Sequence, residues 1–77
     1  MPDSLFLSNI SAGQCVKLVR VNAGRRLSHR LAELGLTPGV EFSVLHDNGG
    51  PLVLSVRNSR IAIGRGMAKK ISVDLIC

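Results

Sequence analysis

Aromatic side chains are almost absent from this sequence, which argues against one way of binding nucleic acid. Among 77 residues only Phe6 and Phe42 are aromatic, and neither Trp nor Tyr occurs. Proteins that read single-stranded nucleic acids usually stack the bases on several exposed aromatic side chains. We therefore do not expect base recognition, and a salt-sensitive contact with the phosphate backbone is kept as an alternative function.

Cysteines and long apolar runs are also scarce. The only cysteines are Cys15 and Cys77, and so sparse a pair is not the disulfide framework of a small secreted domain. We expect both to be free thiols in a reducing compartment. The sequence contains no run of about 18 apolar residues, the length that could span a bilayer. The N-terminus does not resemble a secretory signal. The sequence predicts a cytoplasmic protein without membrane insertion.

Acidic residues are half as frequent as basic ones. Asp and Glu total 5 and Lys and Arg total 10, which gives a formal net charge of +5. A basic domain favours acidic partners, which include nucleic acid, anionic lipid and acidic protein surfaces. Charge alone does not choose among them.

No motif for catalysis or for a cofactor is present. The cysteines, histidines and serines show no spacing that would join a nucleophile, a base and an orienting group. Gly64-Arg65-Gly66 lacks the glycine spacing and the final Lys-Ser or Lys-Thr of a phosphate-binding P-loop. We interpret residues 64–70 as a compact turn. The sequence predicts a protein that is not an enzyme, with no cofactor and no small-molecule substrate.

Two short pairs could offer metal ligands. His29 and Glu33 are one helical turn apart, and His46 precedes Asp47. A stable site for a first-row metal normally needs three or four converging side chains. We therefore predict no metal site, and we expect Glu33 to pair with His29 or Arg30 on a solvated helix face.

The hydrophobic pattern is mainly that of short strands. Leu27, Leu31 and Leu34 follow a helical period, which predicts one short helix near residues 25–34 that Gly35 terminates. Thr37-Pro38-Gly39 is typical of a type II turn. Strand patterns occupy residues 15–21, 40–45, 52–56, 61–63 and 71–75.

The short connections predict antiparallel pairing, because a parallel crossover needs a dozen or more residues. An open sheet would expose edges and an apolar face, so closure into a barrel is favoured. We predict a mainly β fold, a small SH3-like barrel of about five antiparallel strands with one short α-helix. Residues 1–77 would form a single domain, with residues 1–7 as a flexible or peripheral segment.

Three segments of the chain together form a specific pattern. Residues 27–39 read LSHRLAELGLTPG, residues 50–52 read GPL and residues 59–73 read SRIAIGRGMAKKISV. The first is similar to the signature RL-x-x-LG-(hydrophobic)-x-PG of the FeoA family, the small accessory proteins of bacterial ferrous iron uptake, and the other two resemble two further segments of that family. The order and spacing of all three cover nearly the whole chain after Leu7.

This resemblance implies an SH3-like domain and a cytoplasmic adaptor that modulates iron uptake by docking on the FeoB transporter, which contains a GTP-binding domain. The same domain type resembles the C-terminal module of metal-dependent repressors, so a regulatory module is an alternative. The motif residues have structural roles: we expect Leu31 and Leu34 to face the core and the Arg30 guanidinium to reach backbone carbonyls. Gly35, Pro38 and Gly39 would shape the backbone.

Basic residues at two turns are the candidate docking surface. We expect these turns to meet at one end of the barrel, where the patch would steer an acidic partner. The residues are Arg57, Arg60, Arg65, Lys69 and Lys70. Arg25 and Arg26, at the helix start, form a second candidate.

Overall fold

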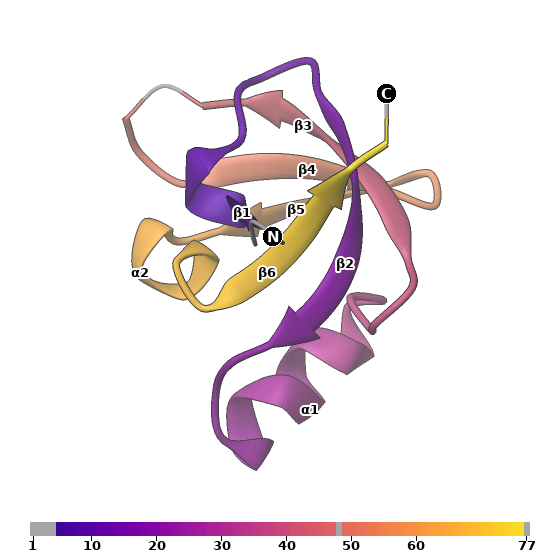
Figure 1. The fold of residues 1–77 in the computed structure, drawn as a ribbon, viewed down its shortest axis with the longest axis vertical. Helices are drawn as coiled ribbons and strands as arrows, with labels where there is room; N and C mark the ends of the chain where they lie inside the picture. Colours follow the sequence, from indigo (N-terminus) through magenta and orange to yellow (C-terminus); the bar gives the residue numbers. More distant parts are fainter. Residues whose placement is uncertain (1–4, 48, 77) are drawn as a thin grey trace.

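Six strands form one antiparallel sheet in the computed structural model, which describes residues 5–47 and 49–76. The strand order is β1-β6-β2-β3-β4-β5 (Figure 1). The strands are β1 (Leu5–Phe6), β2 (Cys15–Val21), β3 (Glu41–His46), β4 (Leu52–Val56), β5 (Ser59–Ile63) and β6 (Ile71–Leu75). The helical segments are the 3₁₀ turn η1 (Leu7–Asn9), the α-helix α1 (Arg25–Glu33) and the short α2 (Arg65–Ala68).

The sheet is not closed by hydrogen bonds, unlike the predicted barrel. Its edge strands are β1 and β5, and each pairs on one side among the described residues. The segments that follow these edges, η1 and α2, contact each other. Contact between two short helical segments, and not a last strand pair, therefore links the two ends of the sheet. The mainly β antiparallel fold is confirmed, with an additional strand and an additional short helix.

The N-terminal segment is part of the sheet where the structure describes it. Leu5 and Phe6 pair with Val73 and Ser72 of β6, and Leu7 is fully buried. Residues 5–7 therefore contribute an edge strand and one core side chain. Residues 1–4 lie outside the described part of the chain.

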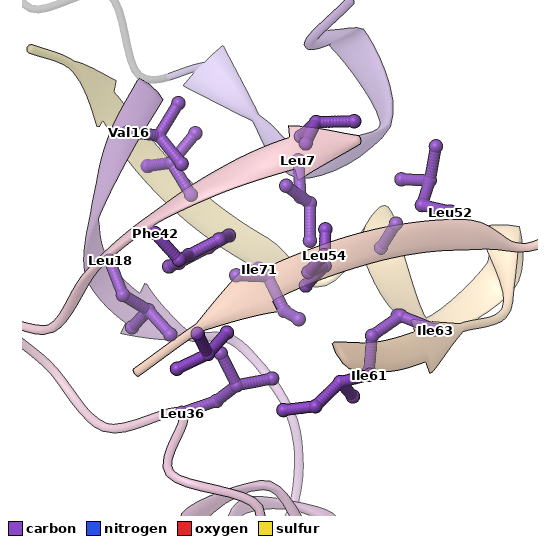
Figure 2. Close-up of a cluster of buried hydrophobic side chains, with 14 of the residues drawn as sticks. Leu7, Val16, Leu18, Leu36, Phe42, Leu52, Leu54, Ile61, Ile63 and Ile71 are labelled. Atoms are coloured by element: carbon purple, nitrogen blue, oxygen red, sulfur yellow. The ribbon is translucent and has the colours of Figure 1, made fainter. Parts of the chain in front are cut away.

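Aliphatic side chains fill the core, as the near absence of aromatic residues requires. The two strands of the β3–β4 hairpin alternate between buried and less buried positions. Phe42 in β3 is the one aromatic side chain buried in the core. Figure 2 shows side chains from several strands meeting between the curved sheet and its connections, among them Leu7, Leu18, Phe42, Leu54, Ile63 and Ile71.

The end of α1 corrects the predicted helical stripe. Leu31 is buried, but Leu34 is 47% exposed and Leu36 is buried in its place. Gly35 adopts a φ of 93°, and the amides of Gly35 and Leu36 donate to the carbonyls of Ala32 and Leu31. These two bonds define a Schellman motif, in which the second residue after the cap packs back on the last helical turn. The reversal at Gly35 therefore buries Leu36 and leaves Leu34 outside.

Two turns follow from local backbone preferences. Gly39 has a φ of 94°, and Val40 donates to the Thr37 carbonyl, as the predicted type II turn requires. The β4–β5 turn is shorter than expected, because Arg57 and Asn58 both adopt positive φ and Val56 pairs directly with Ser59. This tight turn lengthens the predicted strand 61–63 to Ser59–Ile63.

Cys15 is disulfide-bonded, so the expectation of a free thiol is wrong for this residue. Antiparallel pairing of β2 with β6 brings Ile76 beside it, and the amide of Ile76 donates to the Cys15 carbonyl. Cys77, the only other cysteine in the sequence, lies outside the described residues. Cys15 and Ile76 are far apart in the sequence, and only the pairing of β2 with β6 brings them together, so the sequence alone did not reveal their proximity.

Leu54 provides a test of the core, because its side chain is fully buried in β4. Replacing Leu54 by Ala should lower the free energy of unfolding by about 2–5 kcal/mol, through lost transfer energy and the cavity left behind. Urea denaturation followed by circular dichroism measures this difference. A loss below about 0.5 kcal/mol would be typical of a surface position and would contradict the packing described here.

Gly35 tests the Schellman motif. A Cβ at this position would meet only Val56, at an ordinary 3.8 Å, so the penalty of Gly35→Ala comes from its positive φ. We expect a loss of about 1–2 kcal/mol in unfolding free energy. Gly66→Ala is the matched control, because Gly66 lies within α2 with open space around it and no positive φ. Equal losses in both variants would refute a conformational role for Gly35.

Candidate docking site

A bulge in β2 determines where Arg20 lies. Leu18 pairs with Val73 and Arg20 with Ser72, so Val19 is an extra residue on the β2 side. Strict alternation after the buried Leu18 would turn Arg20 toward the core. The bulge shifts the phase by one residue, so Arg20 is exposed and Val21 packs against the core instead.

A chain of side-chain hydrogen bonds then orients Arg20. Its Nε donates to Oδ1 of Asn22 at 3.0 Å, and Nδ2 of Asn22 donates to Oγ of Ser72 at 3.0 Å. Ser72 is only 4% exposed, and the amide of Asn22 also donates to the Lys70 carbonyl. Asn22 is thus held to the start of β6 at two points. The terminal nitrogens of Arg20 form no hydrogen bond or ion pair within residues 5–47 and 49–76.

Arg20 borders a groove between α1 and the end of β2, where Figure 1 shows the helix lying beyond the arrowhead of the strand. The groove encloses about 400 Å³. Most of its lining is apolar. We call the apolar lining residues Val21, Ala32, Leu36 and Pro38 the floor and the basic side chains Arg20 and His29 the rim; Ser28 and Thr37 complete the lining.

The solvent face of α1 adds positive charge beside this groove. Arg25, Arg26, His29 and Arg30 are all exposed, and Glu33 is the only acidic residue of the helix. The first turn contains no acidic residue, and Gly24 provides no side-chain cap. Cations near a helix N-terminus oppose the helix dipole, so helix stability does not explain Arg25 and Arg26.

Two expectations for α1 are not met. Arg30 donates no hydrogen bond to a backbone carbonyl of any described residue, because it lies about 100° around the helix from the buried Leu31 and faces solvent. Glu33 forms no ion pair with His29 or Arg30 in the described part of the chain. The motif arginine is therefore a surface cation in this structure.

The structure separates the residues of the first predicted basic surface. Arg57 lies in the β4–β5 turn and Arg60 beside it, whereas α2 follows the opposite end of β5 (Figure 1). At about 3.3 Å per residue, the four steps of a five-residue strand keep these ends roughly 13 Å apart. The turns therefore do not meet at one end, and whether either group docks a partner is still a prediction.

Arg65 is already engaged within the molecule. Its Nη2 forms an ion pair with Oδ1 of Asp47, and its Nε is buried without a hydrogen-bond partner among the described residues. This pair ties α2, which the sequence suggested was only a turn, to the end of β3. Lys69 and Lys70 are exposed after α2, and the Lys70 carbonyl places this segment next to Asn22.

The described residues show no cluster of three or more His, Cys, Asp or Glu side chains that could hold a metal ion. Of the two aromatic residues, Phe42 is buried and Phe6 is half-buried in β1. No helix within residues 5–47 or 49–76 is long and apolar enough to cross a membrane.

Sequence reasoning missed Arg20, Asn22 and Ser72 as a connected group. One signal was available, because Lys17 and Arg20 are both polar yet lie three residues apart in a predicted strand. Both cannot face solvent under strict alternation, so their spacing indicates a bulge. Nothing in the sequence reveals that Ser72 lies opposite Arg20.

Comparisons with known proteins agree on one family. Residues 6–75 match the model of the FeoA domain. Over 62 residues the chain is 37% identical to a protein of Methanocaldococcus jannaschii with the provisional name Fe(2+) transport protein A, covering 80% of this chain and 76% of that protein. A crystal structure of an iron uptake regulatory protein (FeoA) superposes with a TM-score of 0.89 at 32% identity, over 96% of this chain and 100% of that one.

The fold also occurs within a larger protein. The crystal structure of ScaR with bound Zn²⁺ superposes with a TM-score of 0.82 at 26% identity. The match covers 94% of this chain but 37% of ScaR.

Proposed function

The chain belongs to the FeoA family, and from that premise we propose that it is a cytoplasmic accessory protein of ferrous iron transport that docks on the FeoB transporter. The observation that carries this proposal is the family match over residues 6–75. Family membership supports a role in Fe²⁺ transport, and docking on the cytoplasmic part of FeoB is the finer step that we propose. In this role the protein modulates transport through its surface and catalyses no reaction.

The structure offers a physical basis for docking. A net charge of +5 favours encounter with acidic surfaces. The α1 face and the groove beside it combine exposed cations with an apolar floor, which is the composition that lets charge steer approach while apolar contact holds the complex. Neither feature requires a bound cofactor.

The likeness to ScaR supports the fold and does not favour a repressor function. This chain corresponds to about a third of that protein. The nucleic-acid alternative rests on the positive net charge alone, since neither aromatic residue lies on an exposed platform.

Binding to the transporter tests the proposal. Purified FeoB from the same genome, held in nanodiscs on a sensor surface, should bind this protein saturably. Raising the salt concentration from about 0.1 M to about 1 M shortens the Debye length from ~10 Å to ~3 Å and should slow association. Uptake of radiolabelled Fe²⁺ by cells that lack the protein should change and should be restored by the wild-type chain. Absence of binding at both salt concentrations would refute docking.

A further inference from the structure

The α1–β2 groove has the shape of a site for a side chain and not for a flat surface. It is concave, encloses about 400 Å³, and its floor includes the buried Leu36 together with Val21, Ala32 and Pro38. Apolar floors of this kind gain stability when an inserted apolar group excludes water. The floor predicts that the occupant carries at least one aliphatic or aromatic side chain.

The rim predicts a negative charge on the same occupant. Arg20 is held by Asn22 through Nε, which leaves Nη1 and Nη2 to donate hydrogen bonds to an anionic partner. A guanidinium with a fixed orientation is suited to bidentate contact with a carboxylate. His29 shares the rim, and Arg25, Arg26 and Arg30 extend the positive charge along α1.

We infer that the groove between α1 and β2 binds an acidic segment of a partner protein, with an apolar side chain on the groove floor and a carboxylate paired with Arg20. The inference rests on the proposed function and deepens it, because it names the surface and the chemistry of the partner segment. Asn22 and Ser72 act as positioning residues for Arg20.

A protein segment fits this site better than a membrane or a nucleic acid. A bilayer presents a broad surface, whereas this groove is a local concavity whose floor reaches the buried Leu36. A phosphodiester backbone matches Arg20 but supplies no apolar group for the floor, and no exposed aromatic residue of the described chain borders the groove to stack a base. An acidic segment with an apolar side chain satisfies both parts of the site.

A peptide titration tests the groove without assuming which transporter region binds. The probe is a soluble 12-residue peptide of Glu and Asp with two Leu residues, compared with one in which Ala replaces Leu and one in which Gln and Asn replace the acids. In ¹H–¹⁵N spectra, the acidic Leu peptide should shift the amides of Val21, Ala32 and Leu36 and the side-chain Nε signal of Arg20. Both altered peptides should bind more weakly.

Single substitutions test separately how the charge of Arg20, its orientation by Asn22 and the open space of the groove contribute to peptide binding. Arg20→Glu should weaken peptide binding by about tenfold or more, because it reverses the central ion partner. Arg60→Glu makes the same change at an exposed position of β5 and is the matched control, expected to alter affinity less than about twofold at moderate salt. Asn22→Ala should weaken binding less than Arg20→Glu does, and Arg20→Lys should not restore full affinity because it loses the contact with Asn22. Ala32→Met, which retains helix propensity, should occupy the groove and weaken binding.

Circular dichroism and thermal unfolding confirm that each variant is folded before its affinity is compared. Three results would overturn the inference. The first is that the peptide shifts amide signals only outside the groove, and the second is that Arg20→Glu and Arg60→Glu lower the peptide affinity equally. The third is that the protein binds vesicles of anionic phosphatidylglycerol but not the peptide. No peptide binding at millimolar concentration would overturn it as well.

The same variants on the FeoB sensor separate the two proposals. Binding of FeoB that Arg20→Glu and Ala32→Met leave unchanged would refute the groove as the docking site while docking itself stands. Groove binding of the peptide without any binding of FeoB would refute the proposed partner while the groove specificity stands.

Discussion

The pairing of β2 with β6 is the contact on which the rest of this molecule depends. It joins residues 15–21 to residues 71–75 across most of the chain length and places β6 between β1 and β2. Without it, the β1–β6 pair would be separated from the other four strands of the sheet. It also contains the bulge at Val19, so the same pairing that completes the sheet turns Arg20 outward.

The core shows how a small domain with few aromatic residues can still exclude water. Leu, Val and Ile from the strands interdigitate with Leu7 of η1 and with Leu31 and Leu36 at the end of α1. Because a domain of this size buries a modest share of its surface, each of these side chains contributes a large part of the net stability. The contact between η1 and α2 serves the same purpose, since it covers the gap between two edge strands.

Local order at the surface distinguishes the groove from the other charged regions. The cations of the α1 solvent face form no side-chain hydrogen bond or ion pair with the described residues, whereas Arg20 is tied through Asn22 to the buried Ser72. A held cation loses less conformational entropy on binding than a mobile one. Arg65 shows the opposite case, because its ion pair with Asp47 uses its charge inside the molecule.

The sequence by itself determined the elements whose signals are local. Alternation in residues 41–46 and 52–56 marks two strands, Gly39 after Pro38 marks a turn, and the 27–39 motif identifies the family. These signals depend on backbone preferences and on periods of two or 3.6 residues, which neighbouring positions express directly.

Tertiary structure alone decided which residues face one another. Leu36 replaces Leu34 in the core because the chain reverses at Gly35, and Arg57 lies far from Lys70 because β5 runs between their turns. Arg20, Asn22 and Ser72 meet because a bulge shifts one strand by a residue relative to its neighbour. Such contacts depend on strand register, which is a relation between distant segments that no local pattern contains.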